Sequence, residues 1–118
     1  MNPANGNLNA EVAACDAEDV ELAVNAARNS FDQGLWSNCD PKHRAKVLVR
    51  LGELILKNAS ELALLESIDM GKLARDALKF DIPSSAEVFR WYGEATDKLT
   101  DEVIPTGNGP FAMITRQP

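Results

Sequence analysis

The positions at which helices begin are the strongest constraint that this sequence places on its fold. Asp16 is a favourable helix N-cap, and Asp19 adds a second carboxylate to the first turn, where the helix dipole is positive. The pair Asp40-Pro41 repeats the signal, because proline at the first helical position loses no hydrogen bond. Another Asp-x-Pro start follows at residues 81–83. The sequence therefore predicts a helical region over residues 16–100.

Each start is followed by apolar residues at helical spacing, as a helix with one buried face requires. Gly34 follows the first expected helix and Gly71 the third, where a C-terminal glycine belongs. In the last helix, we expect the pairs Arg90–Glu94 and Glu94–Lys98 to attract one another across one turn. The apolar stripes are Val20, Ala23, Val24, Ala27 and Phe31; Val47, Leu48, Leu51, Leu54 and Ile55; Leu62, Leu65 and Ile68; and Val88, Tyr92, Ala95 and Leu99.

Strand signals are confined to the two ends of the chain. Residues 7–14 follow an Asn-Gly turn and favour a short strand, and residues 111–115 form a β-favouring run behind a second turn. The sequence offers neither run an evident partner strand. The expected fold class is mostly α, with about four helices and short N- and C-terminal strands.

Composition argues against several classes of partner. The formal net charge of −6, with acids and bases interleaved, provides no basic surface for nucleic acid. The apolar runs are far shorter than the ~20 residues that cross a bilayer, so no membrane role is expected. The first residues lack the basic and apolar regions of a signal peptide, which makes the cytoplasm the expected location.

Few residues in the chain suggest catalysis. Cys39 lies near His43 and two other basic residues, whereas Cys15 precedes three acids, so Cys39 is the better nucleophile candidate. A small structural cysteine and a surface histidine nevertheless explain both residues. The chain has one histidine and no Cys-x-x-Cys spacing, which excludes a zinc site, and no strand–glycine–helix unit forms a phosphate loop. We assign no catalytic and no cofactor-binding residue.

One acid occupies an unusual position. Asp69 lies at the C-terminal end of a predicted helix, where the negative dipole disfavours a carboxylate. A bound cation or the nearby Lys72 would offset this cost, and an exposed, tolerated acid is the alternative.

Several motifs occur together in a recognisable order. They are Asn2-Pro-Ala-Asn-Gly6, Ala17-Glu-Asp-Val20, Trp36-Ser37, Glu66-Ser-Ile-Asp-Met-Gly-Lys72, Arg90-Trp-Tyr92, Asp97-Lys98, Ile104-Pro105 and Thr115-Arg-Gln-Pro118. In this order they resemble the N-terminal segment of the NAD(P)-dependent aldehyde dehydrogenases, over essentially the whole chain. Leu73 departs from the family's usual proline. The motifs at Asp69, Asp81 and Arg90 look most like the γ-glutamyl-aminobutyraldehyde and ω-aminoaldehyde branch.

The resemblance implies a parent enzyme of the α/β aldehyde dehydrogenase fold, a cytoplasmic homo-oligomer that oxidises an aldehyde to a carboxylic acid with NAD or NADP. The family's catalytic cysteine and glutamate have no counterpart in this chain, so we expect the 118 residues alone to be inactive. The chain would form one segment, with a turn and strand in 1–15, helices in 16–100 and the start of an oligomerisation arm in 101–118.

Site residues follow from the same resemblance. Asp69 matches the family position that contributes to a monovalent cation site. Pro83 and Ser84, with Val88 one turn further along, match the helix that lines the substrate entrance. A reading from another class is a stand-alone helical module without enzymatic activity, which would use its exposed apolar stripes for protein interaction or oligomerisation.

Overall fold

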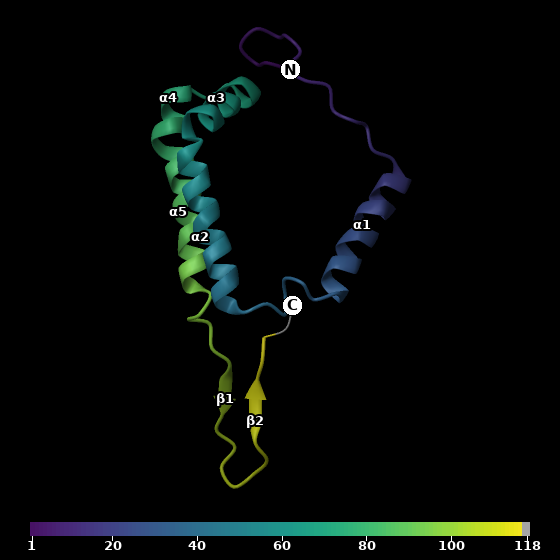
Figure 1. Cartoon of the computed structure of the whole chain (residues 1–118), viewed down its shortest axis with the longest axis vertical. Coiled ribbons are helices and arrows are strands. Elements are labelled where there is room, and N and C mark those ends of the chain that lie inside the picture. Colours follow the sequence, from purple (N-terminus) through teal and green to yellow (C-terminus); the bar gives the residue numbers. More distant parts are fainter. Residues whose placement is uncertain (117–118) are drawn as a thin grey trace.

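A computed structural model describes residues 1–116 as an open arrangement of helices with one hairpin (Figure 1). The fold class expected from the sequence is confirmed as mostly helical. The elements are α1 (Ala17–Asp32), α2 (Pro41–Lys57), α3 (Ala59–Met70), α4 (Ala74–Asp76), the π-helical turn η1 (Ala77–Asp81), α5 (Ile82–Ala95), β1 (Glu102–Ile104) and β2 (Ala112–Ile114).

The predicted N-caps at Asp16 and Asp40 are confirmed by their hydrogen bonds. Asp16 Oδ1 accepts hydrogen bonds from the backbone N–H groups of Glu18 (2.9 Å) and Asp19 (3.2 Å), and Asp19 Oδ2 accepts one from the Asp16 N–H (3.1 Å). This reciprocal capping box satisfies N–H groups that α1 leaves without helical partners. Asp40 Oδ1 accepts from the Lys42 N–H at 2.8 Å, and Pro41 opens α2.

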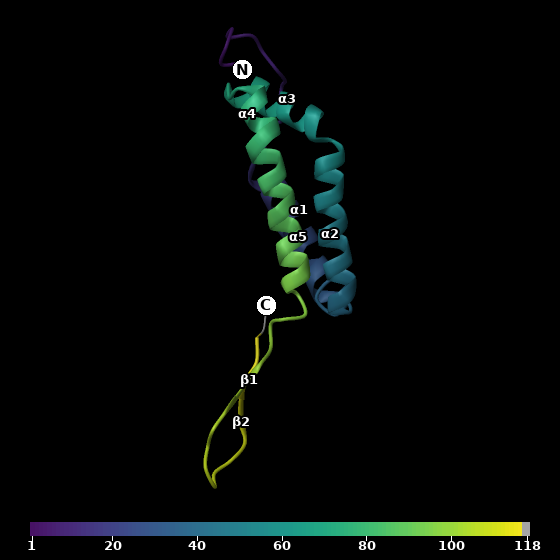
Figure 2. The same ribbon diagram turned by 90° about the vertical axis from the view of Figure 1, so that its left-hand side faces the viewer.

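Helices α2 and α5 lie side by side and antiparallel, which Figures 1 and 2 show from two directions. Glycine allows this close approach at two places. A Cβ on Gly52 would lie 2.8 Å from the Ala86 carbonyl oxygen of α5, and one on Gly93 would lie 3.0 Å from the Ala45 oxygen of α2. Both glycines are buried, so each helix presents a notch to the backbone of the other.

The predicted helix start at Asp81 is wrong, because the chain is already helical there. Asp81 has right-handed helical dihedrals and makes no side-chain cap, and α4, η1 and α5 form one continuous rod. The N–H of Ile82 donates to the Ala77 carbonyl five residues earlier, so this turn contains one residue more than a turn of α-helix and is wider. Pro83 therefore sits just after a π turn rather than at the N-terminus of a new helix.

The core of the chain is small. Its buried apolar residues are Ala63, Ala77, Ile82 and Ala86, and no large side chain of the described residues is fully buried. Helix α1 contacts no other described element, which leaves Val20 56% exposed and Phe31 47% exposed. The predicted apolar stripes lie on α1, α2, α3 and α5, except for Leu99, which lies beyond the end of α5 at Ala95, and this chain covers little of them.

Global dimensions agree with this open arrangement. The radius of gyration is 21.0 Å, whereas a compact domain of this length has about 13.5 Å. The accessible surface is 9629 Å², compared with roughly 6,300 Å² for a compact monomer of this mass. Much of the surface therefore has the character of an interior that lacks its covering layer.

The strand expectations are correct at one end only. Residues 7–14 form no strand, and the Asn9 side chain instead donates a hydrogen bond to the Ile68 carbonyl at 2.9 Å. The C-terminal run does have a partner within the chain, since β2 pairs antiparallel with β1 and Val103 lies opposite Met113. The turn at residues 106–109 joins the two strands into an exposed hairpin.

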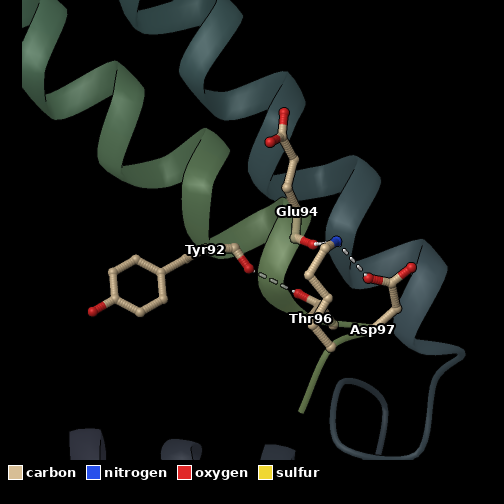
Figure 3. A network of polar contacts seen from close by, with 5 residues as sticks. Tyr92, Glu94, Thr96 and Asp97 are labelled. Atoms are coloured by element: carbon tan, nitrogen blue, oxygen red, sulfur yellow. Dashed lines mark hydrogen bonds and ion pairs between the residues drawn. The ribbon is translucent and has the colours of Figure 1, made fainter.

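A polar cluster closes the C-terminal end of α5 (Figure 3). The Lys98 ammonium donates to the Glu94 backbone carbonyl and to Asp97 Oδ1, and the Thr96 hydroxyl donates to the Tyr92 carbonyl at 3.0 Å. The expected pairing of Lys98 with the Glu94 carboxylate is wrong, because Lys98 binds the main chain instead. A cation at this end also complements the negative pole of the helix. The other expected pair, Arg90–Glu94, is present at 3.7 Å.

No helix within residues 1–116 has both the length and the apolar character that a bilayer crossing requires.

Replacing Gly52 with alanine tests the importance of the α2–α5 contact. The new Cβ would meet a backbone oxygen, so the helices must separate, and we expect a loss of about 1–2 kcal/mol of stability after the better helix propensity of alanine is counted. Urea unfolding followed by circular dichroism measures the change. The control is Ser85→Ala on the exposed surface of α5, and equal stability of the two variants would contradict the close packing.

The Lys98 cluster predicts a titration. The hydrogen bond from Lys98, and then its charge, lowers the pKa of Asp97 below its ordinary value of 3.8. Asp97 therefore stabilises the fold above pH 3.8, and this contribution is lost as the pH falls through its lowered pKa. Carboxyl NMR shifts should show the Asp97 pKa rising toward 3.8 in Lys98→Met but not in Lys79→Met. An unmoved Asp97 titration would rule out the cluster.

Candidate functional site

The C-terminal end of α3 carries Asp69, the residue expected to contribute to a cation site. The helix stops at Gly71, whose φ of +80° belongs to the left-handed region and whose N–H bonds to the Ser67 carbonyl at 3.0 Å. Asp69 is exposed just before this stop. The structure thus confirms the local geometry behind the expectation, whereas the cation itself stays a prediction.

A surface hollow of about 730 Å³ adjoins Asp69. The N-terminal segment forms one wall and α3 another, with Ile82 at the start of α5 closing the end. Glu66 and Asp69 are its ionisable lining residues, and they stand one helical turn apart. The lining residues are Leu8, Asn9, Ala10, Leu62, Leu65, Glu66, Ile68, Asp69 and Ile82.

The N-terminal turn is fixed against the same helix end. A Cβ on Gly71 would lie 2.9 Å from Pro3 Cγ, so the glycine makes room for the proline as well as for the left-handed backbone. Asn9 binds the Ile68 carbonyl and satisfies one of the last acceptors of α3. These contacts hold the N-terminal segment against the C-terminal end of α3. Residues 1–116 contain no group of three or more histidine, cysteine or acidic side chains able to hold a metal ion.

The three residues expected at the substrate entrance lie on the first turns of α5. Pro83 is half-buried, whereas Ser84 and Val88 are exposed one turn apart on the same face. At the i+4 spacing this face points away from Gly93, which contacts α2. This face continues to Trp91, which is 62% exposed. The Trp91 ring lies edge-on to the Tyr92 ring, with 4.9 Å between the two ring centroids. The structure therefore groups Ser84 and Val88 on an open, partly aromatic surface.

The two expected sites lie at the same end of the helical rod. Ile82 lines the hollow beside Asp69 and is followed directly by Pro83, although Pro83, Ser84 and Val88 do not themselves line that hollow. In Figure 1, α3, α4 and the beginning of α5 cluster together near the N-terminus. Asp69 and Pro83 are 14 residues apart in the sequence, and they lie at the same end because α4 and η1 fold back against α3.

The cysteines and the histidine show no catalytic arrangement in the described residues. Cys15 is exposed, and the Cys39 thiol donates to the Trp36 carbonyl at 3.0 Å, which is a structural contact. His43 lies exposed in the first turn of α2. The absence of a catalytic residue in this chain stays a prediction.

An ion pair between Lys72 and Asp81 is a feature that sequence reasoning missed. Sequence reasoning names Lys72 or a bound cation as a group that would offset Asp69, but the Lys72 ammonium contacts Asp81 Oδ2. The hydrogen bond to Asp81 is the main cause that raises the pKa of Lys72 above its ordinary 10.5, against a smaller opposing effect of desolvation. The Asp81 position was interpreted as a helix cap, and nothing in the spacing of the two residues indicated the pairing.

Comparison with known proteins extends over the whole chain. The aldehyde dehydrogenase family model matches residues 1–118. The sequence is 44% identical to the aminoacetaldehyde dehydrogenase of Pseudomonas aeruginosa, covering 99% of this chain and 24% of that protein. It is 44% identical to the NADP/NAD-dependent aldehyde dehydrogenase PuuC of Escherichia coli, covering 92% of this chain and 22% of that protein.

Solved structures give the same result for the fold. The chain superposes with a TM-score of 0.94 on the indole-3-acetaldehyde dehydrogenase of P. syringae, solved in complex with NAD⁺ and IAA. The two are 47% identical, and the match covers all of this chain and 24% of that one. The chain thus spans about a quarter of the length of the relatives it matches. Since the family model matches every residue and the backbone superposes closely, this chain belongs to the aldehyde dehydrogenase family.

Proposed function

We propose that this chain is the N-terminal segment of an NAD(P)-dependent aldehyde dehydrogenase that oxidises an aldehyde to a carboxylic acid. The observation that carries the proposal is the superposition of the whole chain on a dehydrogenase solved with NAD⁺, at 47% identity. The segment supplies scaffold rather than chemistry, and the catalytic cysteine and glutamate come from outside these residues.

The open surface supports this role. Helix α1 has an apolar stripe and no buried residue, and α5 exposes Val88 and Trp91. Such faces lower their free energy by packing against further protein. A stand-alone interaction module would expose similar faces, but the family match over residues 1–118 favours the enzyme segment.

The segment does not itself fit a dinucleotide. A phosphate-binding unit leads from a strand through a glycine-rich turn into a helix, whereas both strands of the described chain follow the last helix. We therefore assign NAD or NADP to other parts of the parent enzyme.

The exposure of the side chains and the pairing of the strands support a division of the segment into three parts. The first 15 residues brace α3, residues 16–100 form the helical scaffold, and residues 101–118 begin an oligomerisation arm. A two-stranded hairpin is marginally stable alone. Val103, Ile104, Met113 and Ile114 are all exposed on β1 and β2, so a partner surface would stabilise it. We accordingly propose a cytoplasmic homo-oligomer in which this hairpin contacts another subunit.

Asp69 is proposed to help hold a monovalent cation. Asp69 belongs to the last turn of α3, where the helix dipole is negative, so a cation there would offset both the carboxylate and the dipole. Pro83, Ser84 and Val88 are proposed to line the substrate entrance. The substrate class is proposed to be an ω-aminoaldehyde, because a named relative at 44% identity is an aminoacetaldehyde dehydrogenase.

A chimera tests the proposed activity. This chain replaces the matching segment of the Pseudomonas aeruginosa relative, and we expect aldehyde-dependent NADH formation with an aminoaldehyde preferred over indole-3-acetaldehyde. The controls are the relative without its segment and this chain alone, which should both be inactive. A chimera that folds and binds NAD⁺ but oxidises no aldehyde would contradict the proposal, as would NADH formation by the 118-residue chain alone.

Cation binding is tested in the same chimera by thermal unfolding in KCl and in choline chloride. If K⁺ binds the native state, a concentration ten times its Kd adds about 1.4 kcal/mol of stability. Asp69→Asn should abolish the difference between the salts, whereas Glu61→Gln, an exposed acid on the same helix, should preserve it. An equal K⁺ effect in the two variants would remove Asp69 from the cation site.

A further inference from the structure

The π turn η1 explains how a proline is accommodated inside a continuous helical rod. In a regular α-helix the ring of Pro83 would clash with the carbonyl four residues earlier, at Lys79. The Ile82 N–H bonds instead to the Ala77 carbonyl, five residues back, and the widened turn leaves room for the ring. The first turn of α5 therefore depends on a helix geometry that is rarely stable by itself.

Asp81 occupies the last position of this π turn. Its Oδ2 atom is shielded from solvent, although 35% of the side chain as a whole is exposed. The ammonium of Lys72 contacts the same oxygen and supplies the compensating charge. Lys72 comes from the link that follows Gly71, so the pair joins the end of α3 to the beginning of α5.

The charges around the pair leave Lys72 without a substitute. Glu66, Asp76 and Asp81 all act on its ammonium and favour the charged form. The nearby Arg75 is bound to Asp76 at 3.1 Å. Loss of Lys72 would therefore leave the shielded oxygen of Asp81 among other acids without its compensating charge, at a cost limited by the partial exposure of both side chains.

The rest of α5 is positioned by different contacts. From Ala86 onward the helix is held by the close approach to α2, where Gly52 faces the Ala86 carbonyl. The turn before Ala86, residues 82–85, carries Pro83 and Ser84. Ile82, at 9% exposure, anchors its beginning in the small core with Ala63 and Ala77.

We propose that Lys72 and Asp81 are positioning residues, which hold the π turn and the first turn of α5 so that Pro83 and Ser84 keep their place at the substrate entrance. The placement of Pro83 and Ser84 at a substrate entrance rests on the proposed function. The role of the pair in fixing residues 82–85 is independent of it. Neither residue is required to touch the substrate.

The test uses the chimera and four substitution sets. Lys72→Met and Asp81→Asn each remove one charge with little change of shape, the double variant removes both, and Lys72→Arg keeps the charge. Arg50→Met breaks an exposed ion pair with Glu53 at 2.7 Å and is the matched control. The double variant keeps the test informative if a single variant folds poorly, because it leaves no unpaired charge.

Two measurements separate the roles. Hydrogen exchange of the Ile82, Ser84 and Ser85 amides should become about threefold faster in either single variant, because the lost ion pair is partly exposed and contributes modestly to holding the turn. It should change less in the double variant, and Lys72→Arg and Arg50→Met should leave it unchanged. In aldehyde kinetics the single variants should raise KM by about tenfold with kcat nearly constant, as expected when binding rather than chemistry is impaired.

Each alternative result has a distinct meaning. Unchanged exchange of residues 82–85 in Lys72→Met and Asp81→Asn would overturn the positioning role. Faster exchange with an unchanged KM would overturn the connection to the substrate entrance. A chimera that oxidises no aldehyde before any substitution would contradict the proposed function instead, and the exchange result would still decide the role of the pair.

Discussion

The close approach of α2 and α5 through their two glycines is the contact on which the rest of the structure depends. Gly52 and Gly93 bring the helices together backbone to backbone, so this antiparallel pair is closely packed although it buries few large side chains. The link to α3 leaves α2 at one end, and η1 enters α5 at that same end (Figure 1). The α2–α5 pair is therefore the frame that fixes the positions of both the hollow beside Asp69 and the first turn of α5.

Outside that frame the chain is held by local contacts. Capping fixes α1 at Asp16, Lys98 closes α5, and the hairpin pairs with itself. None of these interactions covers the apolar faces of α1 or α5. The resulting radius of gyration, 21.0 Å, is that of an open chain with uncovered apolar faces, which the proposed role as a segment of a larger enzyme would explain.

Local signals in the sequence were sufficient for the parts of the fold that local interactions determine. The caps at Asp16 and Asp40 and the stop at Gly71 were predicted because each depends on residues within one turn. Asp81 was misjudged, since an Asp-x-Pro pattern is the same whether the preceding residues are helical or not. The pairing of β1 with β2 and the strand expected at 7–14 depend on distant partners, which periodicity does not reveal. The placement of Asp69 followed from the predicted helix end, whereas the Lys72–Asp81 pair needed the path of α4 and η1 to be known.

We propose that this chain is a scaffold segment of an aldehyde dehydrogenase. Reconstitution of an active enzyme from this chain and a truncated relative is the most direct test. The Pseudomonas aeruginosa relative, produced without its matching segment, is titrated with the purified 118-residue chain while NADH formation from an aldehyde is followed. We expect neither part to be active alone. Activity should rise with added chain until it saturates at one chain per subunit. A stable complex of the two parts with no NADH formation at saturation would contradict it.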